Sequence, residues 1–251
     1  MTTMTINEIL DDLRRGGFVF PSAGMKAAVE QKEEITPHLL QILKDTNVDP
    51  YDTPEESMAY VAAMYLLAQF REKRAFPLII EFCRLPEIEE FLNDIITEDL
   101  ARILVSVFDG DVQSIQDLLE DEDTNEWVRA EMLRTLELLY ALDKVDRDQL
   151  VAYHRRLYDK LRPEDDILWG ILVHSTARLH FAELRSKINR AFTQNLVDLS
   201  FIGQDDVDQM LANASPETVE SDVLSAAEEA YIDDAYAETR PWYDYMDEDE
   251  R

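Results

Sequence analysis

A short pattern of residues recurs along this chain at intervals of roughly 34 to 41 positions. Each copy holds an apolar helical stretch, a charged corner and a second apolar helical stretch. The first stretches end at equivalent positions, separated by 38, 34 and 37 residues: Phe70, Phe108, Leu142 and Leu179. A purely helical pattern with this period is typical of helical-hairpin solenoids. One hairpin cannot bury both of its faces, so neighbouring hairpins are expected to stack.

The apolar residues inside these copies have helical spacing. Leu100, Ile103, Leu104 and Val107 stand at i, i+3, i+4 and i+7, which places them on one face of a helix. The run 53–56, Thr-Pro-Glu-Glu, has the spelling of a capping box with proline in the first turn. Alternating strand patterns are weak throughout. The sequence therefore predicts an all-α fold, and an irregular helical bundle stays open as the alternative to a solenoid.

The stripes and caps give approximate boundaries. We predict hairpins at about 23–45, 56–84, 98–120, 125–161 and 165–197. Further helices are predicted at about 6–14, 87–95, 204–212 and 216–230. These segments make up a helical repeat domain over 1–212, a C-terminal helix over 213–230 and an acidic, aromatic tail over 231–251.

The charge balance limits the kinds of partner. The chain has 54 acidic and 24 basic residues, a formal net charge of −30. Nucleic acids and anionic membranes are polyanions, so we expect the chain to bind neither. In the simplest interpretation, the excess of acidic residues keeps the protein soluble. A more specific interpretation is that it recruits a basic partner or mimics nucleic acid.

Cysteine usage and the terminal sequence favour the cytoplasm. Cys83 is the only cysteine, so no disulfide can form within the chain. The N-terminus lacks a basic region followed by an apolar stretch, so no secretory signal is expected. The longest apolar run, Met58–Ala68, has 11 residues and is too short to span a bilayer.

Several phrases resemble the bacterial family catalogued as domain of unknown function 1186. They are Ile35–Leu40, Tyr65–Pro77 (YLLAQFREKRAFP), Ile96–Leu104 and Thr124–Arg129, and the resemblance spans roughly residues 5 to 212. It implies a bacterial helical protein of HEAT-like architecture and supplies no activity. The fold expected is thus an all-α, HEAT-like α-α superhelix (solenoid) of about five helical hairpins.

Some members of that family end in a short Cys-rich metal-binding motif. This chain has no cysteine in its C-terminal half, so a zinc role is not expected here. None of its four histidines forms a His-x-x-x-His pair, and no Gly-rich phosphate loop or Gly-x-Ser-x-Gly elbow occurs. His154 lies within an apolar stripe and reads as a packed histidine, and Cys83 as a core thiol. We therefore predict no catalytic residue, no metal site, no cofactor and no enzyme activity.

Basic residues are concentrated in one stretch of this acidic chain. Residues 144–190 hold 10 basic and 7 acidic side chains. Paired or solvated helix-surface charges are one interpretation, and a groove that attracts an acidic peptide is the other. The candidate groove residues are Arg71, Arg74, Arg155, Arg156, Arg185 and Arg190.

The final stretch is acidic but also aromatic. From position 205 onward it holds 16 acidic and 2 basic residues, and its candidate docking residues are Trp242, Tyr243 and Tyr245. Acidic tails usually stay solvated, but aromatic rings supply area that can be buried. One hypothesis is that Trp242–Glu250 folds back onto the strip around Arg155, Arg156, Arg185 and Arg190.

The sequence thus favours a scaffold or adaptor that binds another protein through a groove. Two alternatives remain open, namely an acidic mimic that inhibits a nucleic-acid-binding protein and, less favoured, a metal-dependent hydrolase. Neither the partner nor the oligomeric state follows from the sequence.

Overall fold

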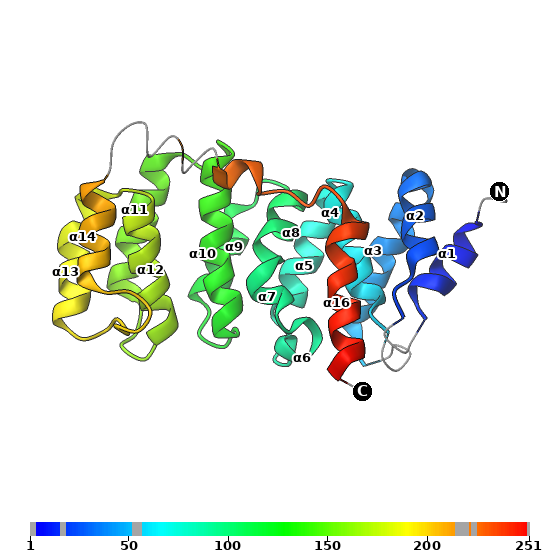
Figure 1. Cartoon of the computed structure of the whole chain (residues 1–251), viewed down its shortest axis with the longest axis horizontal. Coiled ribbons are helices and arrows are strands. Elements are labelled where there is room, and N and C mark those ends of the chain that lie inside the picture. The colour runs from blue at the N-terminus through cyan, green and yellow to red at the C-terminus, as the bar shows by residue number, and fades with distance from the viewer. Residues whose placement is uncertain (1–3, 16–18, 52–56, 214–220, 222–224, 250–251) are drawn as a thin grey trace. The chain divides into compact units, whose positions relative to one another are not determined.

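A computed structural model of the chain describes residues 4–15, 19–51, 57–213, 221 and 225–249, and Figure 1 shows its helices. No strand occurs among these residues. The prediction of an all-α fold is confirmed. Most of the helix predicted at 216–230 lies outside the described residues, and with it most of the predicted segment 213–230.

The chain divides into two compact units. Unit 1 comprises residues 1–111 together with 231–251, and unit 2 comprises residues 112–230. The sequence-based division differs, because it set residues 231–251 apart as a tail and joined everything before 213 into one domain. The last segment of the chain instead belongs with the first.

Unit 1 is built from nine labelled α-helices and one short 3₁₀ turn among its described residues. They are α1 (Ile6–Leu13), α2 (Ser22–Glu30), α3 (Lys32–Val48), α4 (Ala59–Gln69), η1 (Lys73–Ala75), α5 (Phe76–Phe82), α6 (Ile88–Leu92), α7 (Ile95–Glu98), α8 (Leu100–Val107) and α16 (Ala235–Asp249). The labelled elements of unit 2 are α9 (Val112–Glu120), α10 (Glu126–Ala141), α11 (Arg147–Lys160), α12 (Asp166–Arg178), η2 (Ala182–Leu184), α13 (Arg185–Thr193) and α14 (Gln204–Ala212).

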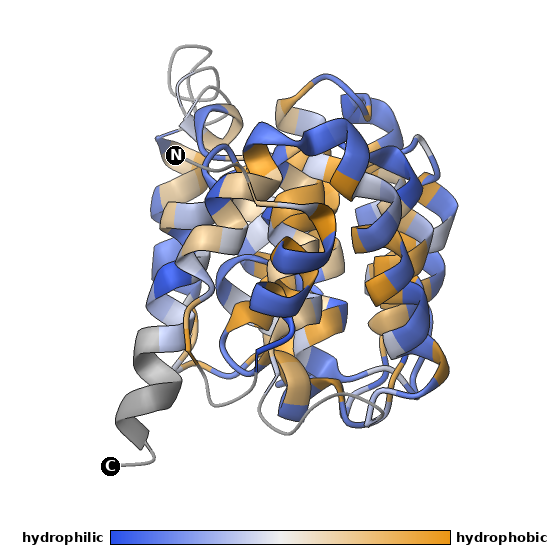
Figure 2. Ribbon diagram, turned by 90° about the vertical axis from the view of Figure 1, so that its right-hand side faces the viewer, coloured by the Kyte–Doolittle hydropathy of each residue, from blue (hydrophilic) through white to orange (hydrophobic). Residues whose placement is uncertain are grey.

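Four of the five predicted hairpins fall within one unit each. They are the pairs α2–α3, α4–α5, α10–α11 and α12–α13. The predicted hairpin at 98–120 corresponds to α8 and α9, which belong to different units. Hydrophobic and hydrophilic residues both occur along most ribbons (Figure 2), and helices such as α11 bury residues at helical spacing, for example Leu150, His154 and Leu157. Buried apolar sides of this kind form the core of each unit.

Helices at equivalent places in successive hairpins pack on one another within each unit. In unit 1, α2 packs on α4 and α4 on α8, and α3 packs on α5. In unit 2, α10 packs on α12 and α12 on α14, and α11 packs on α13. This is the nearest-neighbour stacking expected of helical repeats.

Ion pairs in unit 2 join side chains that stand one period apart. Arg147 donates to both carboxylate oxygens of Glu183, 36 positions further on, at 2.6 and 3.0 Å. Arg156 pairs with Glu120, also 36 positions away. The period read from the sequence is therefore also the spacing of the contacts between stacked hairpins.

A third pair with the same spacing is buried. Arg129 Nη1 donates to Asp165 Oδ1 at 2.9 Å, and each side chain is only 6% exposed. Arg129 Nε also donates to the Leu119 carbonyl at 2.9 Å, and the Arg162 backbone N–H donates to Asp165 Oδ2. Burial alone would raise the pKa of Asp165, but the hydrogen bonds from Arg129 and Arg162 outweigh it and lower that pKa.

The hairpin corners share one backbone geometry that lacks glycine. Arg71, Asp143 and His180 follow the ends of α4, α10 and α12 with φ of 57°, 56° and 53°. After α10, the Lys144 N–H bonds to the Leu139 carbonyl at 2.8 Å, and the Asp143 N–H bonds to the Tyr140 carbonyl at 3.0 Å. This is a Schellman motif, in which glycine usually supplies the left-handed residue.

We predict that two substitutions of Asp143 will differ in stability, because this corner requires a positive φ. Asp143 is exposed, so substitutions there change the backbone preference with little change in packing. Asp143→Gly should be more stable than Asp143→Ala by about 1 kcal/mol, because glycine adopts positive φ without a Cβ clash. Hydrogen exchange of the amides in α10 and α11 would measure the difference within unit 2. Equal protection from exchange in the two variants would contradict the expected cost of a Cβ atom at positive φ.

Candidate binding site at the C-terminal helix

Helix α4 has no polar side over most of its length. Every residue from Ala59 to Ala68 is buried. A helix that is apolar all round must be covered all round. In unit 1 the helices α2, α3, α8 and α16 pack against it. Figure 1 shows α16, in red, among the helices of unit 1. The C-terminal helix α16 therefore covers one side of α4.

An extended segment leads into α16 and is held by hydrogen bonds to its backbone. Arg71 Nη1 donates to the Ile232 carbonyl at 2.7 Å, and Arg102 Nη2 donates to the Tyr231 carbonyl at 2.8 Å. The Ile232 N–H donates to Ser106 Oγ at 2.9 Å. Ile232 itself is fully buried. These bonds fix where the helix begins.

Two adjacent aromatic residues anchor α16 further along. Trp242 Nε1 donates to Tyr65 Oη at 2.7 Å and lies 3.2 Å from Asp99 Oδ2. Tyr243 is 2% exposed, and its hydroxyl donates to the Met58 carbonyl at 3.3 Å. Both rings thus meet residues of α4 or its start, and each polar atom has a partner there.

Another aromatic group connects α16 with the start of α2. Phe20 makes edge contacts with the rings of Tyr236 and Tyr243, with centroids 5.0 and 5.3 Å apart. The Tyr236 hydroxyl lies 3.0 Å from Ser22 Oγ, and Lys26 Nζ lies 4.5 Å from the centre of the same ring. The side of α16 facing α2 is therefore aromatic and hydrogen-bonded.

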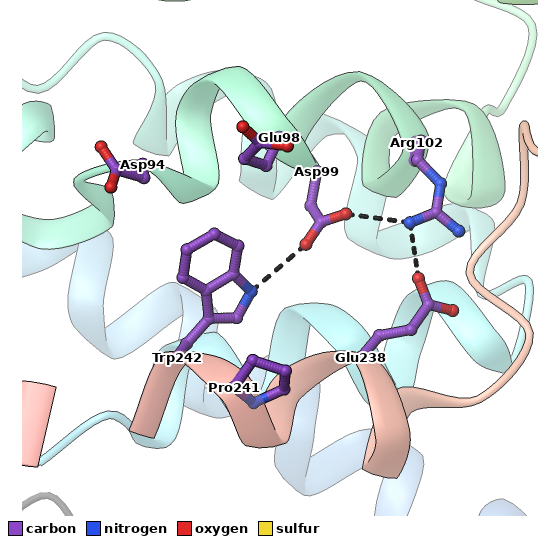
Figure 3. A pocket seen from close by; sticks show the side chains of 7 residues that line it. All are labelled: Asp94, Glu98, Asp99, Arg102, Glu238, Pro241 and Trp242. Atoms are coloured by element: carbon purple, nitrogen blue, oxygen red, sulfur yellow. Dashed lines mark hydrogen bonds and ion pairs between the residues drawn. The ribbon is translucent and has the colours of Figure 1, made fainter. Parts of the chain in front are cut away.

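Asp99 is the centre of a polar network beneath Trp242. Its Oδ2 accepts a 2.5 Å hydrogen bond from Tyr65 Oη, and its Oδ1 accepts one from Arg102 Nη1 at 2.9 Å. Arg102 also reaches Glu238 Oε2 at 2.5 Å, so one guanidinium joins α8 to α16 (Figure 3). Burial, together with the Asp99 charge, raises the pKa of Tyr65 well above its usual range, so its hydroxyl stays a donor.

A pocket of about 360 Å³ opens next to this network. Its lining residues are Asp94, Glu98, Asp99, Arg102, Glu238, Pro241 and Trp242. Asp94 and Glu98 are exposed and stand at the two ends of α7, across from the indole ring of Trp242 (Figure 3). The lining holds four carboxylates and one guanidinium, so the pocket carries a net negative charge.

The predicted basic strip in unit 2 is largely paired with carboxylates of the same unit. Arg156 pairs with Glu120, and Arg185 with Asp208. Arg190 donates to the Tyr158 carbonyl at 2.6 Å and to Asp159 at 2.9 Å. The fourth member, Arg155, is exposed. The hypothesis that Trp242 and its neighbours dock on this strip is replaced by the contacts described above, all of which lie within unit 1.

The two predicted arginines of unit 1 have different surroundings. Arg71 touches the C-terminal segment, where its Nη2 donates to Asp233 at 2.5 Å and its guanidinium lies 4.4 Å from the Tyr231 ring. Arg74 pairs with Glu72 through two hydrogen bonds of 2.8 Å. The side chain of Tyr245 lies outside the described residues.

One serine–histidine pair has the spacing of a catalytic dyad but no access. His154 Nε2 accepts from Ser175 Oγ at 2.8 Å, and His154 Nδ1 donates to the Leu150 carbonyl at 2.9 Å. The two side chains are 0% and 1% exposed, so no substrate reaches them in this structure. Burial lowers the pKa of His154 to about 4, and the pair acts as a buried structural link between α11 and α12.

The only cysteine of the chain is also buried. Cys83 is fully buried, and burial raises the pKa of its thiol to about 12. Within the described part of the chain, no group of three or more His, Cys, Asp or Glu side chains is placed to hold a metal ion. No described helix is long and apolar enough to cross a membrane.

Sequence reasoning missed most residues that hold α16. No binding role was assigned to Tyr65, Asp99, Arg102, Ser106 and Glu238, because they come together only in the folded unit. A signal was nevertheless present in the run from 58 to 68, which offers no polar face to solvent. Such a helix requires a cover on every side, and the aromatic C-terminal stretch was a suitable one.

Comparison with known proteins now places the chain in a family. The model of "Protein of unknown function (DUF1186)" matches residues 4–246. The chain belongs to this family. An uncharacterized protein of Chlamydia trachomatis serovar D is 36% identical over 245 residues, covering 96% of each chain. One from Chlamydia muridarum is 35% identical over 244 residues, covering 95% of this chain and 97% of its own.

No solved structure matches the chain. The family match reaches beyond the resemblance seen in the sequence, because it includes the segment that contains Trp242 and Tyr243. Most of α16 is therefore part of the family pattern.

We predict that unit 1 depends on the aromatic anchors of α16. Tyr243→Ala should destabilise it by about 3–5 kcal/mol, because a buried ring is replaced by a cavity. Trp242→Phe should cost about 1–2 kcal/mol, since it keeps most of the ring but removes the donor to Tyr65 and Asp99. Hydrogen exchange of the α4 amides reports the effect. Ala237→Gln, at an exposed position of the same helix, is the control, and a comparable loss in that variant would contradict the prediction.

The buried histidine predicts a pH dependence in unit 2. The pKa of His154 is lowered on folding, so the unfolded chain binds the additional proton and stability falls as the pH drops from about 6.5 towards 4. Between pH 7 and pH 5 the wild type should lose about 2 kcal/mol more than His154→Gln. Hydrogen exchange of α11 and α12 at both pH values measures this. His38→Gln, at an exposed site on α3, should keep the wild-type dependence, and an identical loss in all three proteins would refute the assignment.

Proposed function

We propose that this protein is a helical scaffold that binds another protein. The observation that supports the proposal best is the stacking of hairpins through contacts one period apart, as in Arg147–Glu183 and Arg129–Asp165. Repeat proteins built in this way present long surfaces whose residues come from successive repeats, and they act mainly by binding. On this proposal the HEAT-like description applies to the stacked hairpins within each unit.

The chemistry of the core is consistent with a binding role. The reactive side chains that could suggest catalysis, Cys83, His154 and Ser175, are all buried. The pocket beside Trp242 is an open candidate site, where exposed carboxylates meet an aromatic ring. Such a surface suits recognition of a protein more than the activation of a small substrate.

We predict that the full chain has a stable protein companion in its source organism. Tagged full-length protein, captured under native conditions, should recover one or a few proteins in near-stoichiometric amounts. An unrelated acidic protein of similar net charge is the matched control, because a charge of −30 attracts basic proteins without specificity. Recovery of the same proteins by the control, together with a chain that elutes alone from native extracts, would contradict the scaffold role.

A further inference from the structure

We propose that the pocket beside Trp242 receives a positively charged side chain, arginine or lysine, from a basic segment of a protein partner. The inference rests on the proposed scaffold function and adds the chemistry of the partner. The lining of the pocket, an internal contact of the same kind and the charge of the adjoining helix support it.

The carboxylates of the pocket differ in whether a cationic side chain of the same chain pairs with them. Asp99 and Glu238 share the guanidinium of Arg102. The structure records no hydrogen bond or ion pair for the side chains of Asp94 and Glu98 among its described residues. These two carboxylates are therefore available to accept hydrogen bonds from a cation that enters the pocket.

The indole ring makes an amino-acid cation a better fit than a simple ion. Trp242 is held by its Nε1 atom, and its six-membered ring points towards the segment that carries Asp94 and Glu98 (Figure 3). A guanidinium can lie against an aromatic ring while it donates hydrogen bonds to carboxylates at its edge. The volume of about 360 Å³ falls at the small end of ligand pockets, which suits a single long side chain.

Unit 1 already contains a contact of this kind. The guanidinium of Arg71 lies 4.4 Å from the ring of Tyr231 and donates to the carboxylate of Asp233 at 2.5 Å. An aromatic ring and a carboxylate together thus bind an arginine at the start of the C-terminal segment. The pocket offers the same two groups, Trp242 with Asp94 and Glu98, but holds no arginine between them.

The adjoining sequence favours a peptide segment over a free small cation. Helix α16 continues to Asp249, and residues 244–249 of the sequence include Asp244, Asp247, Glu248 and Asp249. Negative charge therefore continues along the same helix beyond the pocket. A basic segment with several cationic residues gains more from this charge than a single small cation does, because several of its charges lie close to the helix at once.

Fluorine NMR of the full chain labelled with 5-fluorotryptophan tests the proposal. The chain has three tryptophans, Trp127, Trp169 and Trp242, and the Trp242 signal is assigned from Trp242→Phe. The probe is a short, flexible peptide with two arginines, and its neutral counterpart carries citrulline at the same places. The arginine peptide should shift the Trp242 signal to saturation, with at least about tenfold tighter binding than the citrulline peptide.

A matched pair of variants localises the effect. Asp94→Asn with Glu98→Gln removes two charges from the pocket. Glu33→Gln with Glu34→Gln removes two charges from exposed positions on α3 of the same unit. The pocket variant should bind the arginine peptide at least about fivefold more weakly than wild type, and the α3 variant should stay within about twofold.

Three results would overturn the proposal. The first is the absence of a saturable shift of Trp242, and the second is equal weakening in the two variants. The third is free argininamide binding as tightly as the peptide, which would make the pocket a site for a small cation. If any of these occurred while native capture still recovered a specific protein, the scaffold function would stand and only the assigned partner chemistry would fail.

Discussion

The packing of unit 1 depends on a helix that has no side suited to water. Residues Ala59–Ala68 of α4 are all buried, and the neighbouring hairpins cover only part of their surroundings. The remaining cover is α16, whose Tyr243 is almost fully buried and whose Trp242 joins a hydrogen-bonded network with Tyr65 and Asp99. Burial of aromatic area provides the driving force, and the polar network fixes the position of the helix.

Arginine side chains make internal contacts in both units, but their partners differ. In unit 2, arginines such as Arg129, Arg147 and Arg156 pair with carboxylates one repeat away. In unit 1, Arg71 and Arg102 hold the backbone and acids of the C-terminal segment. These arginines of an acidic chain therefore serve internal contacts, whereas the described residues include no hydrogen-bond or ion-pair partner for the side chains of Asp94 and Glu98.

The sequence predicted the helices well because their signals are local. The outer limits predicted for four hairpins lie within a few residues of the ends of α2–α3, α4–α5, α10–α11 and α12–α13. The predicted capping run 53–56 lies outside the described residues. The period of the corners corresponds to real contacts, since pairs such as Arg147–Glu183 join residues 36 positions apart. The Schellman corners went unrecognised, because Arg71, Asp143 and His180 hold positions where glycine is the usual signal.

The docking of the C-terminal segment could not be predicted in the same way. It depends on contacts between residues more than 100 positions apart, as in Trp242–Tyr65 and Arg102–Glu238. Charge alone pointed towards Arg155 and Arg156, because it ignored the carboxylates of unit 2 that compete for those guanidinium groups. The apolar character of α4 was the better guide, since it specified a face that some other segment had to cover.

The discontinuity of unit 1 has a consequence for how the protein is made. A ribosome releases residues 1–111 long before residues 231–249, so the nascent chain contains α4 without its last covering helix. During that interval the part of the α4 surface that α16 covers in the finished protein lacks this cover. Unit 1 is therefore complete only after the residues that include Trp242 and Tyr243 have been synthesised.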